Sequence, residues 1–455
     1  MKHRKHRRKP ARKTWNPVWL WVAAFLPVYL VLSGKDGYLG ISAFKTKLLY
    51  GFSAVLLGIS VIQLCSDYRR MSRQRSGNDA WKEILRPTPA QTAALLYLLF
   101  TLLSASLSPF GKHAWYDDVC HENAVTQLCY VLIFLSVSRW ARPTRALAYL
   151  VLICIVAHNA VILLQQSGEN PLGYYPPWTN YEKVQTRPDF LFLGMSGNAD
   201  QVSAVLSLMT PICFGVAALD DKMPVAIRIL AVPLGSICVY ELIEIDVLAG
   251  VVGVACGLFL SAFVLVRARR RTKAFCLLGL GAAGSGAIWY LWTCPTNIRF
   301  FREIHSILHG KISDSFGSGR VFIWRQMLRR IPDQLWFGSG PDTVRKTGLI
   351  PFRRYDAGGK LVAQAAITDA HCLPLEILYT QGLFALCSWL ATVGIVLAPW
   401  FRRKGRTTAA AILGAAIVCF CFTMLFDFSS VIVMPFFWVA LGLLEAENRA
   451  AKRMR

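Results

Sequence analysis

An acidic pair and a histidine stand at the start of an apolar stretch near the end of the chain. Asp369, His371 and Glu376 precede or open a run of mainly apolar residues that continues to Trp400. Histidine is suited to accept a proton near neutral pH, because its unperturbed pKa is about 6.5. A positioned base of this kind accelerates attack by a poor hydroxyl nucleophile, typically by about 10²–10⁴-fold. His371 is therefore a candidate general base, and the two carboxyl groups are candidate ligand contacts.

A basic segment upstream could hold the anionic part of a substrate. Arg320 opens the sequence RVFIWRQMLRRIP. Apolar residues recur there at helical spacing, at Val321, Trp324, Leu328 and Ile331. This pattern predicts an amphipathic helix that lies in the membrane interface and whose extent is limited by the proline at its end.

A glycine turn follows this predicted helix. Gly338 and Gly340 frame the turn, and Pro341 stands where a following helix would begin. A helix N-terminus presents free backbone N–H groups to an anion, and arginine binds phosphate groups through paired hydrogen bonds. Arg320, Gly338 and Gly340 are therefore candidate contacts for an anionic group, although Gly-x-Gly-Pro turns are common in proteins.

Each candidate also has a purely structural interpretation. His371 could be an interfacial polar residue, and Asp369 could cap the next helix rather than orient the histidine. Glu376 could face a wet cavity or pack against another polar group. Arg320 could anchor the chain to lipid headgroups, which is the role we expect for the neighbouring Arg325, Arg329 and Arg330.

The elements that must position these residues belong to a membrane protein. Of the 455 residues, 55% are hydrophobic and only 17% are charged, and the mean hydropathy is +0.42. Soluble domains carry about 25% charged residues. Because the apolar residues form many long runs, the composition indicates a polytopic membrane protein.

The net charge of +24 does not indicate a nucleic-acid-binding protein. The basic residues fall in short clusters between apolar runs, for example in residues 1–13, 267–273 and 402–406. Such clusters are what the positive-inside rule produces, and no folded basic domain is present to bind nucleic acid.

The sequence predicts an all-α fold of about twelve membrane-spanning helices. The expected spans are residues 18–32, 47–66, 91–110, 124–137, 146–165, 199–219, 225–240, 247–266, 274–293, 373–400, 407–426 and 431–444. With the N-terminus inside, the basic clusters at residues 1–13, 267–273 and 402–406 fall on the cytoplasmic side of the cytoplasmic (inner) membrane, and so does the C-terminus.

This topology divides the chain into five parts. Residues 1–17 form a basic cytoplasmic N-terminus, and residues 18–293 form a membrane domain with nine spans. Residues 294–372 form a partly helical extracytoplasmic loop, residues 373–444 form the last three spans, and residues 445–455 form a basic cytoplasmic tail. A loop this long is uncommon unless it is functional or disordered, so we expect it to be folded on the outer face.

The thirteen cysteines do not point to a metal site. Most lie inside apolar runs, where cysteine behaves as a small apolar residue. Neither a Cys-x-x-Cys pair nor another metal-ligand spacing is present. The sequence therefore predicts no metal ligand and no cofactor.

Four segments together resemble the O-antigen ligase and O-antigen polymerase-like family of membrane proteins. They follow the family's order along the chain. The second segment (residues 318–344) and the third (residues 370–386) are the most specific. The second contains an SGR…W pattern and a glycine turn, and the third, after a long gap, contains a histidine that opens a span. The segments are RPDFLFLGMSGNADQVSAVLSLMTP, SGRVFIWRQMLRRIPDQLWFGSGPDTV, AHCLPLEILYTQGLFAL and DFSSVIVMPFFWVALGLL.

The resemblance implies a metal-independent glycosyltransferase at the outer face of the membrane. Such enzymes move a glycan from an undecaprenyl-pyrophosphate carrier to an acceptor hydroxyl on a glycan or lipid. The family's catalytic histidine corresponds to His371 and its loop arginine to Arg320, and the arginine before the G…GN segment corresponds to Arg187.

The sequence departs from the family pattern beside the histidine and in the middle of the chain. The family commonly has His-x-His-Asn before this span, and here Asp369 and Cys372 take the outer positions. The usual Ser-Arg between two middle spans is replaced by ELIEIDVLAG. These departures leave the acceptor open, and ligase and polymerase remain alternatives.

A transporter or flippase of lipid-linked glycans is the alternative from another class. Transporters carry ionisable residues near mid-membrane and often contain inverted repeats. Two spans, residues 247–266 and 274–293, lack charged residues in their interiors, and no repeat is evident. His158 and Asn159 lie inside a span and keep this alternative open.

Overall fold

The computed structural model of the chain describes residues 16–73, 77–116, 120–175, 192–265, 270–294, 299–314, 316–317, 319–355, 361–402 and 406–453. Within these ranges the secondary structure is helical apart from one two-stranded antiparallel sheet. The helices are α1 Pro17–Val31, α2 Ile41–Ser72, α3 Gly77–Leu85, α4 Pro89–Leu107, α5 Lys112–Trp115, α6 Ala124–Trp140, α7 Arg145–Gln166, α9 Ala199–Leu219, α10 Val225–Glu244, α11 Leu248–Leu265, α12 Arg270–Thr293, α13 Arg299–Leu308, α14 Arg320–Gln334, α15 Leu373–Phe401, α16 Thr408–Thr423 and α17 Met434–Arg453, and the strands are β1 Phe352–Tyr355 and β2 Leu361–Ala365.

The helices confirm the expected class of an all-α membrane protein. Among the residues that the structure describes, seven helices are long and apolar enough to cross a membrane, namely α2, α4, α7, α9, α10, α11 and α15. Three shorter apolar helices, α1, α6 and α16, coincide with further expected spans. The ninth and twelfth expected spans fall on α12 and α17. Each expected span thus falls on a helix, while the count of twelve membrane crossings stays a prediction.

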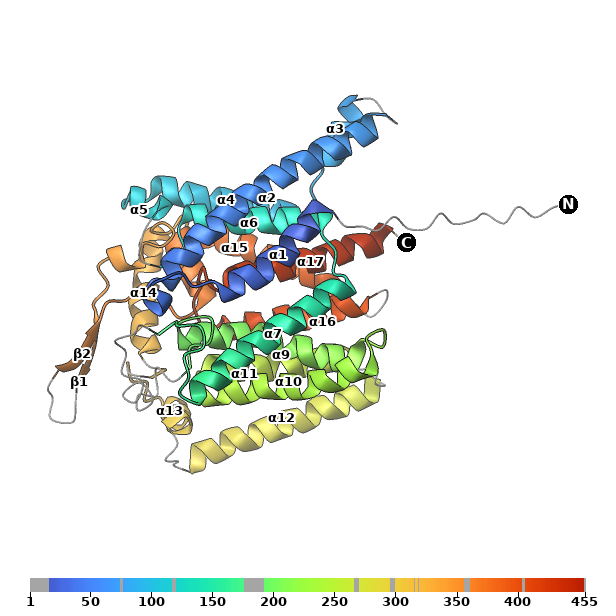
Figure 1. The fold of residues 1–455 in the computed structure, drawn as a ribbon. Helices are drawn as coiled ribbons and strands as arrows, with labels where there is room; N and C mark the ends of the chain where they lie inside the picture. The colour runs from blue at the N-terminus through green and yellow to red at the C-terminus, as the bar shows by residue number, and fades with distance from the viewer. Residues whose placement is uncertain are drawn as a thin grey trace.

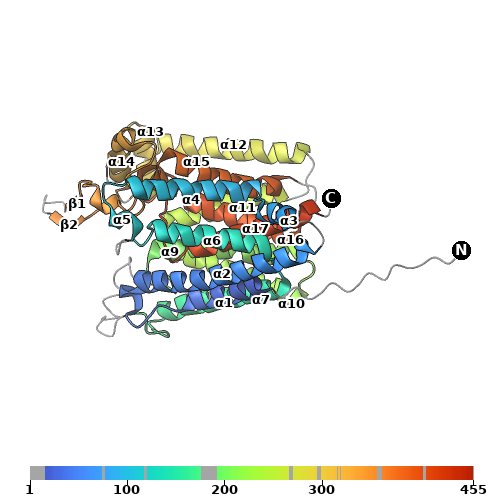
Figure 2. The same ribbon diagram turned by 90° about the horizontal axis from the view of Figure 1, so that it is seen from above.

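The long helices run side by side and leave two ends to the molecule (Figures 1 and 2). The short helices α5, α13 and α14 and the sheet lie at one end, which we call the site end. Helix α3, the start of α1 and the end of α17 lie at the other, which we call the termini end. Which end faces the cytoplasm stays a prediction from the charge distribution.

Aromatic side chains fill the centre of the bundle. Trp438 of α17 is fully buried and stacks near Tyr97 of α4 and Tyr130 of α6. Phe437 stacks on Phe420 of α16 with ring centroids 4.8 Å apart. Large rings supply extensive packing contacts, so these helices form one continuous core.

Helix α15 is broken at Gly382, and the glycine turn of the loop is inserted at the break. Gly382 has φ 87° and ψ 177°, which interrupts the helical hydrogen bonds. The N–H of Ser339 donates to the carbonyl of Tyr379 at 3.1 Å, and the N–H of Gly340 donates to the carbonyl of Thr380 at 2.7 Å. A Cβ atom at Gly338 would lie 2.3 Å from the backbone carbon of Thr380. Only glycine permits this approach of two backbones.

Two expectations for the loop are wrong in detail. Helix α14 extends past Pro332 to Gln334, and it buries Ile323, Met327 and Ile331 while Leu328 is 57% exposed. No α-helix begins at Pro341, because the chain forms only a 3-10 turn at Val344–Lys346. The N–H groups of Ser339 and Gly340 are engaged by α15, so the turn does not present the free helix N-terminus that the sequence predicts.

Candidate active site

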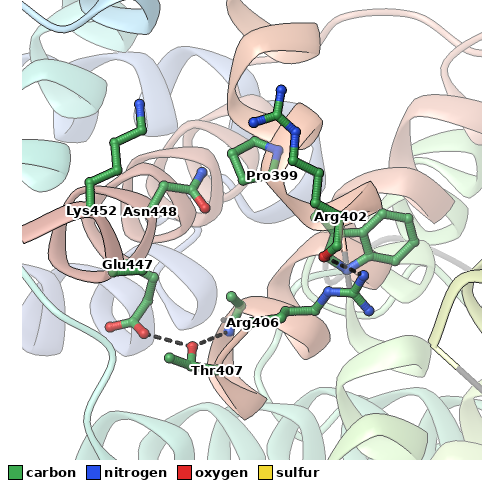
Figure 3. Close-up of a pocket in the computed structure, with 10 residues that line it drawn as sticks. Pro399, Arg402, Arg406, Thr407, Glu447, Asn448 and Lys452 are labelled. Carbon is green, nitrogen blue, oxygen red and sulfur yellow. Dashed lines mark hydrogen bonds between the residues drawn. The ribbon is translucent and has the colours of Figure 1, made fainter. Parts of the chain in front are cut away.

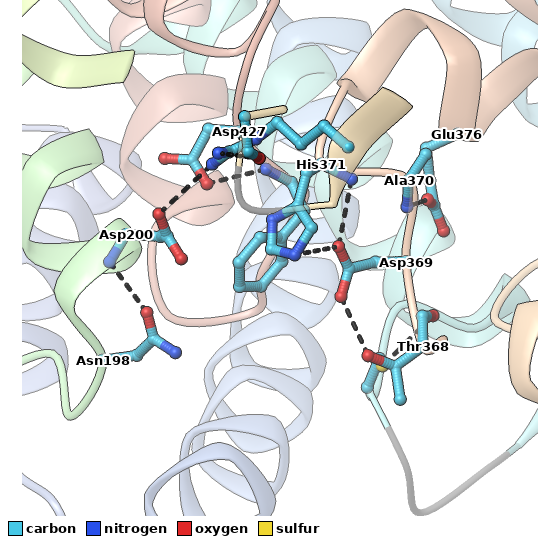
Figure 4. A network of polar contacts seen from close by, with 12 residues as sticks. Asn198, Asp200, Thr368, Asp369, Ala370, His371, Glu376 and Asp427 are labelled. Atoms are coloured by element: carbon cyan, nitrogen blue, oxygen red, sulfur yellow. Dashed lines mark hydrogen bonds and ion pairs between the residues drawn. The ribbon is translucent and has the colours of Figure 1, made fainter. Parts of the chain in front are cut away.

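Four segments that lie far apart in the chain meet at the site end (Figure 4). They are the start of α9, the start of α14, the segment before α15 and the segment before α17. These are also the four segments on which the sequence resemblance rests. Each contributes a polar or charged side chain at a helix end, where a bundle of apolar helices can accommodate such groups.

His371 lies between a carboxylate and an aromatic ring. Asp369 Oδ1 accepts a hydrogen bond from the His371 backbone N–H at 3.1 Å and lies 3.5 Å from Nε2 of the same residue. The ring of Phe428 meets the imidazole edge to face, with centroids 5.2 Å apart. Nδ1 is buried and has no hydrogen-bond partner among the described residues. If Nε2 carries the proton that faces Asp369, Nδ1 holds the free lone pair that a general base needs.

The peptide that carries the histidine is fixed from two sides. The N–H of Ala370 donates to the Glu376 carboxylate, and Nε1 of Trp324 donates to the carbonyl of Ala370 at 2.7 Å. His371 itself has φ 45°, a left-handed conformation that costs a non-glycine residue free energy. Strain of this kind persists where the surroundings enforce it and is often found at functional sites.

Arg320 is the first residue of α14 and faces the same space. Its side chain is 20% exposed, and Nη2 lies 3.8 Å from Oδ1 of Asp200, near the start of α9. Nη1 donates to the carbonyl of Gly317 at 3.0 Å. Nε is buried and unpartnered among the residues that the structure describes.

Asp427 completes the charged group beside Arg320. Its Oδ1 accepts from the backbone N–H of Phe428 at 2.8 Å, and its Oδ2 is buried without a described partner. Burial and then the charge of Asp200 raise the pKa of Asp427 well above its usual range, while Arg320 acts in the opposite direction. Asp427 therefore tends to be neutral, which leaves more of the positive charge of Arg320 for another anion.

Three buried polar atoms in one place thus lack a partner within the described chain. Arg320 Nε is a hydrogen-bond donor, Asp427 Oδ2 is an acceptor when ionised, and His371 Nδ1 can accept a proton. Buried polar groups in folded proteins are normally paired, so each exception needs an explanation. A polar ligand with an anionic part and a hydroxyl could supply these partners.

A second layer of acidic groups lies behind the histidine segment. Glu122 accepts hydrogen bonds from Tyr130, Gln127 and Ser429. Burial raises the pKa of Glu122 to about 7, although these hydrogen bonds favour the ionised form. Glu122, Asp342 and Glu376 line a cavity of about 20 Å³, enough for about one water molecule. With its pKa at about 7, Glu122 can change its protonation state near neutral pH.

The structure brings together some predicted site residues and separates others. Arg320, Asp369 and His371 lie in one polar group, and Glu376 binds the backbone beside it. Gly338 and Gly340 shape the break in α15 instead. Arg187 lies outside the residues that the structure describes.

Sequence reasoning missed Asp200, Asp427 and Glu122 as site residues. Asp200 and Asp427 lie inside two segments of the resemblance, at the start of one expected span and directly after another. Glu122 directly precedes the helix cap of α6 in the sequence HEN. Acidic residues beside apolar runs were the available signal, but only the fold shows that they meet.

The fold and the site define a class: a multi-helix membrane protein with a charged site, built around a histidine and an arginine, at one end of its bundle. The model of the O-antigen ligase family matches residues 242–390. The matched range includes Arg320, the glycine turn and His371 and ends within α15. The resemblance to this family of surface-polysaccharide biosynthesis is thereby confirmed. A comparison with curated proteins finds no match.

Proposed function

We propose that the protein is a glycosyltransferase of the O-antigen ligase or polymerase type. It transfers a glycan from an undecaprenyl-pyrophosphate carrier to an acceptor hydroxyl of a glycan or a lipid. The reaction takes place at the outer face of the cytoplasmic membrane, with both chain termini in the cytoplasm. The observation that carries the proposal is the convergence of His371 and Arg320, both inside the range that matches the family, with acidic side chains beside them.

The proposed reaction needs a base and a positive charge. His371 Nδ1 accepts the proton of the acceptor hydroxyl, whose oxygen attacks the anomeric carbon of the donor glycan. The bond from that carbon to the pyrophosphate oxygen breaks, and undecaprenyl pyrophosphate leaves with the bonding electrons. Arg320 stabilises the negative charge of this leaving group by charge-assisted hydrogen bonds.

Asp369 and Glu376 act through His371 in this proposal. Asp369 holds the imidazole in the tautomer that leaves Nδ1 free, and it stabilises the imidazolium that forms. Glu376 and Trp324 fix the peptide before the histidine. Their part is to position the base rather than to contact the reacting atoms.

Reconstitution of the full chain in liposomes tests the proposal. The donor is an undecaprenyl-pyrophosphate oligosaccharide. One arm supplies only this donor, so that products longer than one repeat report a polymerase. The other arm adds a lipid A-core acceptor and reports a ligase. We expect His371→Ala to lower the transfer rate by about 10²–10⁴-fold. We expect Arg320→Ala to lower the transfer rate and also to raise the KM for the donor.

Two matched variants control for damage to the loop. Arg325→Ala removes an arginine from the same helix, but one that pairs with Asp314 at 2.6 Å. His309→Ala removes an exposed histidine of the same loop. Both should keep the wild-type rate within about twofold, because neither contacts the polar group. Transfer at the wild-type rate by the His371 variant would refute the mechanism.

A further inference from the structure

A second charged region lies at the termini end, away from the candidate active site. A cavity of about 390 Å³ opens there between the ends of α2, α6 and α17 and the short helix α3. Its lining includes two carboxylates, Asp67 and Glu83. It also includes six arginines, Arg70, Arg86, Arg139, Arg142, Arg449 and Arg453.

One of the two carboxylates is already engaged on both oxygens. Asp67 Oδ1 pairs with Arg70 at 3.1 Å, and Asp67 Oδ2 accepts from Nε1 of Trp140 at 3.0 Å. Among the described residues, no ion pair joins Arg139, Arg142, Arg449 or Arg453 to a carboxylate. The lining therefore carries a surplus of positive charge that faces a common space.

The helix ends hold this charge in place without neutralising it. Arg139, in the last turn of α6, donates to the backbone carbonyl of Ile84. Arg449 Nη1 donates to the carbonyl of Ser138 at 3.1 Å. The C-terminal ends of α2, α6 and α17 add partial negative charge, which favours cations nearby. Each guanidinium has five N–H donors, so donors remain for a ligand.

A second cavity at the same end is smaller and has fewer basic residues (Figure 3). It is lined by Arg402, Arg406 and Lys452 together with Glu447, and its volume is about 70 Å³. Arg406 lies over the ring of Trp400 and donates to the carbonyl of Arg402 at 3.0 Å. The basic residues of this smaller cavity are fewer and partly engaged, so it provides an internal control.

We propose that the arginine-lined cavity between α2, α3, α6 and α17 binds a phosphate group, supplied either by the headgroup of an anionic phospholipid or by free phosphate. Arginine forks match phosphate geometry, and several of them around one concave space repel each other unless an anion lies between them. Basic pockets between membrane helices at the cytoplasmic surface bind anionic headgroups. The volume far exceeds the about 10–15 Å³ that a single water needs.

Binding to the purified full chain in a neutral detergent tests this site. The probes are mixed micelles of phosphatidylglycerol, mixed micelles of phosphatidylcholine, and inorganic phosphate. We expect phosphatidylglycerol to bind at least about tenfold more tightly than phosphatidylcholine, and the affinity to fall as salt increases. Competition by millimolar inorganic phosphate identifies free phosphate as a ligand, and its absence identifies the lipid headgroup. Either result supports the site.

Charge-matched variants decide whether binding occurs in this cavity. The double variant Arg142→Gln/Arg453→Gln removes two exposed arginines of its lining. It should weaken phosphatidylglycerol binding by at least about tenfold, because each basic residue near a membrane surface contributes on the order of 1 kcal/mol, and about 1.4 kcal/mol corresponds to tenfold. The double variant Arg402→Gln/Lys452→Gln removes two exposed charges from the smaller cavity and should bind like wild type.

Further outcomes would overturn the proposal. An equal loss of affinity in the two double variants would mean that the net charge of the termini end binds anions without a site. Unaltered binding in Arg142→Gln/Arg453→Gln, or no binding of any phosphate probe by wild type, would also refute it. Arg142→Lys/Arg453→Lys keeps the charge but not the paired hydrogen bonds of arginine, so it should restore part of the affinity, which separates lost charge from a folding defect.

Discussion

The two ends of the bundle carry different kinds of charged groups. At the site end, Asp369 faces His371, Asp427 lies beside Arg320, and Glu122 is held by three hydrogen-bond donors. At the termini end, arginines surround a cavity, and within the described part of the chain four of them form no ion pair with a carboxylate. Acids buried beside a base and an arginine can tune proton transfer, whereas a ring of permanently charged arginines can only attract an anion.

This difference indicates that the site end can catalyse a reaction, whereas the arginine-lined cavity at the termini end can only bind a ligand. Acidic side chains and a histidine gather at the site end, and burial holds the pKa of Glu122 at about 7. Arginine does not titrate in proteins, so the arginines of the cavity at the termini end offer no proton. Variants at the two ends should therefore change different measured quantities.

Replacement of the histidine tests this division most strongly. His371→Ala should lower glycan transfer by about 10²–10⁴-fold, because the acceptor hydroxyl loses its base. Arg402→Gln, at the termini end and outside the arginine-lined cavity, should change the rate by less than about twofold. Comparable losses in the two variants, measured in the same liposome assay, would show that the two ends do not differ in this way.

The break in α15 should be the most sensitive structural feature of the site end. Gly382→Ala would place a Cβ atom 2.2 Å from the carbonyl oxygen of Trp336, on a residue with φ 87°. We expect the free energy of unfolding of the variant to fall by roughly 2–4 kcal/mol. Its unfolding temperature in detergent should fall accordingly.

Gly394 offers a matched control in the same helix. Among the described residues, no heavy atom would lie within 4 Å of a Cβ atom at position 394. Gly394→Ala should leave the unfolding temperature unchanged or raise it, since alanine stabilises a regular helix by roughly 0.5–1 kcal/mol over glycine. If both variants unfold alike, the packing of the glycine turn against α15 is not what stabilises this end.

Much of the fold could be predicted from the sequence because apolar runs and basic clusters are local signals. Each expected span falls on a helix, including short ones such as α6 and α16. The internal shape of a span is harder to predict. Gly382 breaks α15 only because the turn from Gly338 to Gly340 lies against it, and that contact joins residues about forty positions apart.

The candidate site could likewise be predicted only where the signal in the sequence is local. His371 and Arg320 stand out through their residue types and through the segments around them. Asp200 and Asp427 do not, because an acid at a helix end is usually a cap or a solvated residue. Their role depends on the close approach of the starts of α9 and α14 and the segment before α17, which no local sequence pattern predicts.

The raised pKa of Glu122 predicts how the stability of the site end depends on pH. The pKa rises from an ordinary value of 4.5 to about 7 in the folded protein. Between these values the folded state keeps a proton that the unfolded state releases, so this group makes stability fall as pH rises, by up to about 3 kcal/mol in total. Above pH 7 its contribution is constant.

Glu122→Gln should reduce this pH dependence. Unfolding temperatures of the wild type should fall between about pH 5 and pH 7, and those of the variant should fall less. A variant whose unfolding temperature changes with pH as steeply as that of the wild type would show that Glu122 is not the group that titrates, and the distinction between the two ends would then rest on His371 alone.

The smallest effect is expected at Asp427, where it should appear only as a change with pH. Because burial raises the pKa of this carboxyl, Asp427 ionises at a higher pH than an ordinary aspartate, and once ionised it competes with the donor for Arg320. Asp427→Asn should therefore keep kcat within about threefold and remove any rise of KM for the donor that accompanies this ionisation as the pH increases. Asp200→Asn removes the carboxylate 3.8 Å from Arg320 and should instead lower KM throughout. If KM has the same pH dependence in wild type and in Asp427→Asn, the acid beside Arg320 serves packing, and the site end tunes its base but not its arginine.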